Sequence, residues 1–138
     1  MFLVAGHQQA TFEFWERLDS EFEPFVSVLV IKEASRGDSD LAAKRLQAIQ
    51  EFQIIRNNDA AEELARAIIK GRGVPEACSE DALHIALAAM AGMDFVATWN
   101  FSHINNPFTR MVIRKIIEKF GYACPELASP EELLREEL

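Results

Sequence analysis

The stretch "SEDALHIALAAMAGMDFVATWN", residues 79–100, begins as a helix that is apolar on nearly every side. Gly92 ends this helix, and "DFVAT", residues 94–98, follows as a continuous apolar run of strand length. Such a run suits a strand that is buried on both faces, as strands are in a parallel sheet. The stretch therefore predicts a buried helix and a central strand of an α/β domain, with Asp81 and His84 one helical turn apart.

Helices alternate with short strands along the rest of the chain. Ser27 and Asp59 are suitable N-caps, and Gly37 and Gly71 are suitable residues to end the helices that follow them. This alternation predicts an α/β domain with a parallel sheet. We expect helices at residues 3–19, 28–36, 41–50, 60–70 and 105–121, strands at 25–26 and 52–55, and a short extended piece with a final helical turn within 125–138.

The length of 138 residues and an apolar content of 49% suit a single domain, residues 1–138, with its own core. Cys78 and Cys124 form no repeated framework, and no secretory leader opens the chain, so we expect a reducing, cytoplasmic environment. The longest apolar runs, residues 28–31 and 86–91, are far below the roughly 20 residues that span a bilayer. No membrane association is therefore expected.

The formal net charge of the chain is −8. Non-specific binding along a nucleic acid requires clustered Lys and Arg, so this charge argues against a domain that coats RNA or DNA. It is compatible with a metal-dependent nuclease, because such enzymes place carboxylates at the reacting phosphate and a divalent ion reverses the local charge. Net charge alone thus leaves a nuclease open.

Asp81 and His84 require an explanation because the helix that carries them is otherwise apolar. A buried carboxylate has to be hydrogen-bonded, paired with a cation or bound to a metal ion. Either Asp81 is a first-turn partner of the helix dipole and His84 a hydrogen-bonded core histidine, or the pair belongs to a functional site. Spacing alone does not separate these interpretations.

The segment "DALHIALAAMAGMDFVATWNFSHINNP", residues 81–107, resembles the second half of a PIN domain of the VapC-like toxin branch. The resemblance extends to "VSVLVIKEASRGD" (26–38), "GVP" (73–75) and "GYACPELASPEELL" (121–134). It implies a PIN-like, Rossmannoid three-layer fold in which helices flank a central parallel sheet. It also implies an endoribonuclease of toxin–antitoxin type that uses Mg²⁺ or Mn²⁺, forms a homodimer and has a cognate antitoxin.

Carried over position by position, the resemblance implies that Glu33, Asp81 and Asn100 are catalytic residues and metal ligands. Asn100 stands where the family usually has Asp, and its amide oxygen can ligate a hard cation but supplies no charge. The resemblance further implies that His84 and Thr98 support the site, with His84 one helical turn beyond Asp81.

Candidate RNA contacts lie around and beyond this site. Trp99 and His103 can stack on a base, and the alternative for Trp99 is an apolar wedge between helices. Arg110 and Arg114 belong to a basic stripe, which is either a solvated helix face or a contact with the RNA backbone.

The chain departs from the family at the first acidic position. PIN domains open with a strand that ends in Asp followed by Ser or Thr, but no Asp precedes Asp19 here. Either an upstream strand was lost, or a mis-assigned start omits it, or "MFLVAG", residues 1–6, replaces it without an acid. In each case we expect an impaired nuclease, because the ion loses one ligand. The alternatives are an inactive PIN-like binding protein and, if the resemblance is accidental, a plain α/β interaction domain.

Overall fold

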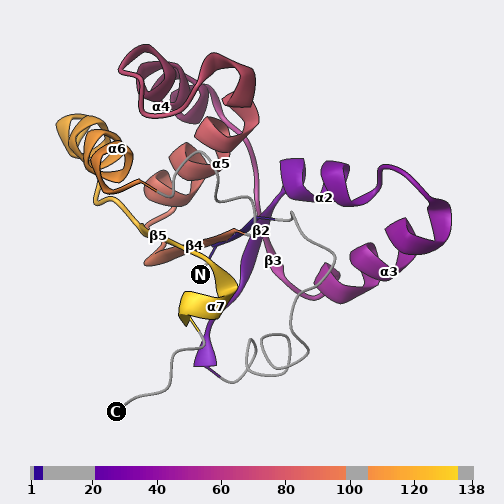
Figure 1. The fold of residues 1–138 in the computed structure, drawn as a ribbon. Coiled ribbons are helices and arrows are strands. Elements are labelled where there is room, and N and C mark those ends of the chain that lie inside the picture. The colour runs from indigo at the N-terminus through magenta and orange to yellow at the C-terminus, as the bar shows by residue number, and fades with distance from the viewer. Residues whose placement is uncertain (1, 5–20, 99–105, 134–138) are drawn as a thin grey trace.

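The computed structural model describes residues 2–4, 21–98 and 106–133. Its strands form one sheet of five strands in the order β3-β2-β1-β4-β5, and every neighbouring pair is parallel (Figure 1). The predicted parallel sheet of an α/β domain is therefore confirmed. The strands are β1 (Phe2–Val4), β2 (Phe25–Ser27), β3 (Gln53–Ile55), β4 (Phe95–Thr98) and β5 (Glu126–Ala128).

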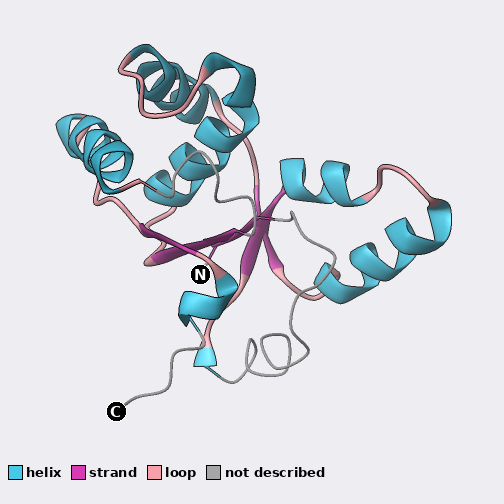
Figure 2. Cartoon of the chain, in the orientation of Figure 1, coloured by secondary structure: helices cyan, strands magenta, loops and turns pink. Residues whose placement is uncertain are grey.

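Helices connect and cover these strands. Helices α4, α5 and α6 stand together, α5 and α7 both contact β4 from different sides, and α2 and α3 lie beside β2 and β3 (Figure 2). None of the helices in the described ranges is long and apolar enough to cross a bilayer. The helices are α2 (Val28–Ala34), α3 (Ser39–Ile49), α4 (Asp59–Lys70), α5 (Ser79–Met90), α6 (Pro107–Lys119) and α7 (Pro130–Leu133), with a 3₁₀ turn at Glu76–Cys78.

Strand β1 corrects the prediction of a helix over residues 3–19. Phe2 pairs with Phe25 of β2 on one side, and Val4 pairs with Thr98 of β4 on the other, so β1 is the central strand. An apolar tripeptide between two parallel strands gains a hydrogen-bond ladder on both sides, which outweighs a local helical pattern. Residues 5–20, the rest of the expected helix, lie outside the described ranges. Three residues of the segment "MFLVAG" thus form a strand that carries no acidic side chain.

The helix caps were predicted with one error. The Ser27 hydroxyl accepts a hydrogen bond from the Val30 amide at 3.0 Å, which confirms Ser27 as the N-cap of α2. The cap of α4 is Asn58 and not Asp59, since the Asn58 side chain accepts from the Ala61 amide at 2.8 Å. Asp59 is instead the first helical residue, where its charge favours the helix dipole.

The main core lies among α4, α5, α6 and the strands β4 and β5. Leu64, Ile68, Leu87, Ile113 and Ile117 are its largest fully buried aliphatic side chains. Helix α5 is buried on all sides except its ends, as its sequence predicts. This core holds α5 against β4 and so fixes the direction of its first turn.

The central position of β1 predicts a large effect of Leu3→Pro. Proline removes a backbone donor, and a central strand has a neighbour on each side to which its amides bond, so the free energy of unfolding should fall by about 3 kcal/mol or more. Leu3→Val keeps the ladder and should lower it by less than about 1.5 kcal/mol. Urea unfolding of both variants tests this, and equal midpoints for Leu3→Pro and the unaltered protein would refute a central β1.

Candidate functional site

The strand order defines a crevice between the carboxyl ends of β1 and β4. The chain passes from β1 to β2 and β3 on one side and then returns to β4 on the other side of β1. Ligands of open parallel sheets bind outside the carboxyl ends of the strands at this point of reversal. Val4 and Thr98, the last residues of β1 and β4, lie opposite each other there. Thr98 and Ser27, which ends β2, are buried polar residues with 5% and 0% exposure.

The two predicted carboxylates belong to helices that meet this edge. Helix α2 starts directly after β2 and carries Glu33 in its last turn. Helix α5 leads into β4 through a short turn, so its first turn, with Asp81, lies at the carboxyl edge of the sheet. Asp81 is half-buried, whereas the sequence predicts a buried carboxylate, because it lies in the first turn of α5 beside the exposed residues Ser79 and Glu80.

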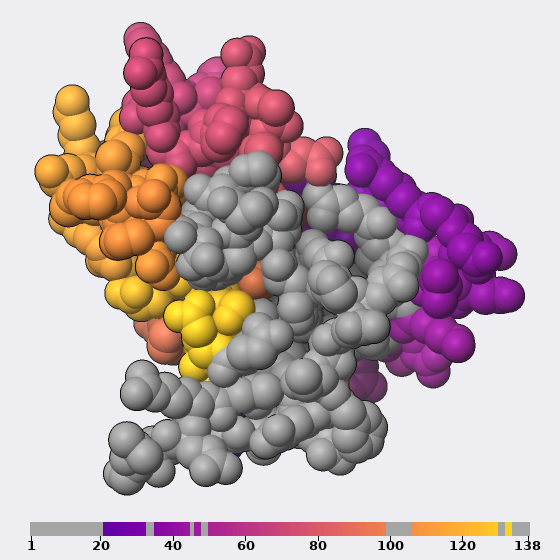
Figure 3. Space-filling view, viewed as in Figure 1, coloured from indigo at the N-terminus to yellow at the C-terminus, as the bar shows by residue number. Residues whose placement is uncertain are grey.

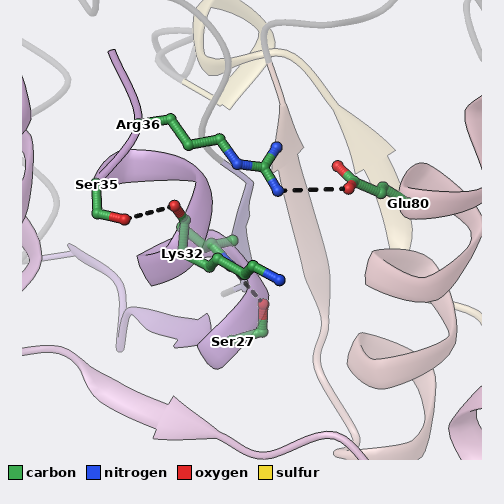
Figure 4. A network of polar contacts seen from close by, with 6 residues as sticks. Ser27, Lys32, Ser35, Arg36 and Glu80 are labelled. Atoms are coloured by element: carbon green, nitrogen blue, oxygen red, sulfur yellow. Dashed lines mark hydrogen bonds and ion pairs between the residues drawn. The ribbon is translucent and has the colours of Figure 1, made fainter. Parts of the chain in front are cut away.

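An ion pair joins the two helices. The Arg36 guanidinium extends from the end of α2 to the first turn of α5, where Nη2 lies 3.9 Å from Oε1 of Glu80 (Figure 4). Glu80 directly precedes Asp81, and Arg36 follows Glu33 by three residues. The ion pair therefore links the turn that follows α2, three residues after Glu33, to the first turn of α5, which carries Asp81.

Part of the predicted site lies outside what the structure describes. The side chain of Glu33 and the whole of Asn100 fall there, so convergence of Glu33, Asp81 and Asn100 on one ion stays a prediction. Trp99 and His103 fall there as well. In the sequence, Asn100 follows Thr98, the last residue of β4, by two positions.

His84 and Thr98, which the resemblance implies as supporting residues, are both buried. His84 is buried at 1% exposure, one turn beyond Asp81 on α5. Thr98 closes β4 at the crevice.

Arg114 has a structural partner. Its Nη2 donates to Oε1 of Glu126 on β5 at 2.9 Å, and this hydrogen bond raises the pKa of the Arg114 guanidinium above its ordinary value. The pair joins α6 to β5 and favours the interpretation of a solvated helix face for this residue. Arg110, one turn earlier on α6, is half-buried. RNA contacts by Arg110 and Arg114 stay predictions.

The sequence analysis missed Arg36 and Glu80 as members of this site. Both charges lie on segments that were singled out for their neighbours, "EASRGD" and "SEDALH". Their spacing along the chain gives no hint that they meet, since 44 positions separate residue 36 from residue 80. Only the folding of α2 and α5 onto one sheet edge reveals the pair.

The candidate ligands suit a hard cation in kind. Carboxylate and amide oxygens are the ligands that Mg²⁺ and Mn²⁺ prefer, whereas β1, with the sequence "FLV", adds no carboxylate. Among the side chains that the structure describes, no three His, Cys, Asp or Glu residues form a group that could hold an ion. Burial raises the pKa of the Cys124 thiol to about 11, so this thiol stays protonated at neutral pH and is a poor ligand for a soft metal.

Comparison with known proteins identifies no relative of this chain. No family model matches the chain, and neither a curated protein nor a solved structure gives a significant match.

The arrangement of the two helices predicts that each carboxylate contributes to ion binding. Glu33→Gln and Asp81→Asn should each weaken Mn²⁺ binding by about tenfold or more, because loss of a ligand acts at least as strongly as loss of a residue that orients one. Isothermal titration calorimetry measures this, and Glu63→Gln, on the exposed side of α4, is the matched control. Unchanged Mn²⁺ affinity in either site variant would remove that residue from the ligand set.

Proposed function

We propose that this chain is a PIN-like protein of toxin–antitoxin type that acts in the cytoplasm as a weak Mg²⁺- or Mn²⁺-dependent endoribonuclease. One observation supports the proposal: an ion pair of 3.9 Å between Arg36 and Glu80 links the turn after α2 to the first turn of α5, beside the point of reversal of a parallel sheet. The resemblance of residues 81–107 to the PIN family assigns RNA cleavage to that edge.

In this proposal the ion is held by Glu33, Asp81 and Asn100. When bound, it activates a water molecule and neutralises charge on the phosphoryl oxygens. The role of the chain is to hold the oxygens that ligate the ion. His84 and Thr98 form the buried support beneath these residues, and the core around α5 keeps Asp81 at the edge.

A nucleotide cofactor is a weaker candidate, although the strand order is shared with dinucleotide-binding folds. Those folds need a Gly-rich turn after the first strand, so that backbone amides approach the pyrophosphate closely. Here the sequence after β1 is "AGHQQA", residues 5–10, with a single glycine. The sequence thus lacks the phosphate-binding turn that such a cofactor requires.

An inactive PIN-like binding protein is the second candidate, and the sequence of β1 favours it. A central strand with no acid leaves two carboxylates and an amide for the ion, and without the ion Glu33 and Asp81 repel a phosphate. The ancestral site then persists as structure, and the protein serves as a partner of an antitoxin or of a second copy of itself.

Cleavage assays on the chain and on variants of the residue after β1 separate these candidates. The chain itself should cleave single-stranded RNA weakly in Mn²⁺. Ala5→Asp should raise the rate by roughly a hundredfold, the scale on which single electrostatic groups act at a reacting centre. Ala5→Asn has nearly the same shape without the charge and should leave the rate unchanged.

Asp81→Asn provides the opposing control. Introduced into the Ala5→Asp protein, it should abolish cleavage while thermal melting changes little, because the amide preserves the shape of the carboxylate. If Ala5→Asp gains no activity over Ala5→Asn, the inactive binding protein is the better account.

The homodimer stays a proposal, with a different surface from the one first expected. Phe2, Phe12, Phe14 and Trp15 would give an opening helix more apolar surface than one core contact needs, which predicts a dimer surface there; but Phe2 belongs to β1, and the others lie outside the described ranges. The flank formed by α2 and α3, purple in Figure 3, contains a hollow of about 390 Å³ that offers an apolar alternative. It is lined by Ile31, Ala43, Leu46, Gln47, Gln50 and Ile54.

Ile54 makes this surface testable, because it lies on β3 at the edge of the sheet and is 53% exposed. Sedimentation at micromolar concentration should give a dimer, and Ile54→Arg should give a folded monomer. Phe108→Arg, at an exposed apolar position on α6, is the control and should leave the dimer intact. A monomeric unaltered protein would contradict the proposal.

A further inference from the structure

We propose that the outer side of α6 is a docking surface for an acidic amphipathic helix of a partner protein. This surface, which we call the α6 face, consists of Phe108, Met111, Lys115 and Lys119. The four residues follow one another at spacings of three and four positions, so they line one side of the helix. None of them belongs to the candidate site, and the inference does not depend on the proposed function.

The α6 face points to solvent because the opposite side of the helix is packed. Ile113 and Ile117 are fully buried in the main core, where α6 contacts α4. The helix stands at the rim of the fold, beside α4 (Figure 1). All four residues of the α6 face are exposed. The face is therefore open to a partner without any rearrangement of the core.

The first half of the α6 face is apolar. Phe108 is 71% exposed, the largest value among the exposed apolar side chains that the structure describes, and Met111, one turn later, is 46% exposed. Single exposed apolar residues are ordinary, but these two are neighbours on one face. Aromatic residues and Met are enriched in protein interfaces. Such a pair suits the apolar stripe of another helix, which presents side chains at the same spacing.

The second half of the α6 face is basic. Lys115 and Lys119 are exposed, and among the described residues neither has an ion-pair partner. Helix α6 carries four basic residues and one acidic residue, whereas the whole chain has 14 basic and 22 acidic residues. The charge of this helix is thus opposite to that of the chain. Carboxylates that flank an apolar stripe would complement it.

The size of the basic region favours a short acidic helix over a nucleic acid. RNA is a long polyanion that extends beyond α6 and meets a chain with a net charge of −8. Exposed charges interact strongly only within about 8 Å at physiological salt, so a partner confined to α6 is governed by the lysines beside it. The 13 residues of α6 span about 20 Å, which a helix of similar length can follow.

Two synthetic peptides test the α6 face. Each is a fluorescein-labelled helix of about 14 residues, with Leu along one side and either Glu or Lys at the other positions. Fluorescence anisotropy should show that the protein binds the Glu peptide about tenfold more tightly than the Lys peptide or better. The net charge of −8 alone would give the opposite preference, so this result identifies a local basic surface.

Variants then locate the binding surface. Phe108→Ala should weaken binding of the Glu peptide by about tenfold, as expected for an aromatic anchor. Lys115→Glu combined with Lys119→Glu should reverse the preference, so that the Lys peptide binds more tightly. Ile54→Ala on β3 and Lys44→Glu on α3 make similar changes at other exposed positions and should leave both affinities unchanged.

The inference fails if the unaltered protein does not bind the Glu peptide, or if the double lysine variant keeps the preference for it. Equal losses in the two control variants would mean that binding is not specific to α6. Dissociation of a homodimer by Phe108→Ala would assign the face to a second copy of the chain. Tighter binding of single-stranded RNA that is lost in the same variants would assign it to RNA, and either outcome overturns the inference. Thermal melting of each variant verifies the fold.

Discussion

The parallel ladders that β1 makes with β2 and β4 are the constraint on which the other features depend. Because β1 lies between β2 and β4, the next strands are added at the two edges of the sheet: β3 beside β2 and β5 beside β4. This order creates the point of reversal at the carboxyl ends of β1 and β4. Without β1 the sheet would divide into two pairs of strands, and the helices α2 and α5 would have no common edge at which to meet.

The same strand explains why the candidate site is incomplete. An apolar tripeptide suits a central position, because both faces of a central strand in a parallel sheet are covered by helices. The proposed binding of a divalent ion at this edge also requires acidic side chains, and the sequence "FLV" of β1 supplies none. Arg36 and Glu80 add a cation and an anion at the rim. In the proposed site, the ion would therefore be held by two carboxylates and one amide, with no acidic residue from the central strand.

The alternation of helices and strands was predictable because amphipathic spacing, caps and short apolar runs are local signals. The helix α5, the strand β4 and the cap Ser27 follow from such signals and are confirmed. Residues 3 and 4 were predicted wrongly as the start of a helix, since a strand of three residues has no local pattern and is stabilised by partners 23 and 94 positions away. The meeting of Arg36 with Glu80 could not be predicted for the same reason. Asp81 and Glu33 were identified by resemblance, and the fold adds only that their helices meet.

Anomalous diffraction from crystals soaked in Mn²⁺ tests the central claim, that this sheet edge holds a divalent ion, most directly. The account predicts one peak outside the carboxyl ends of β1 and β4, with carboxylate oxygens of Glu33 and Asp81 at roughly 2.0–2.6 Å. The oxygen of Asn100 should lie within reach of the ion or of a water molecule bound to it. A peak elsewhere, or carboxylates of Glu33 and Asp81 more than ~8 Å apart, too far to share one ion at those distances, would contradict it.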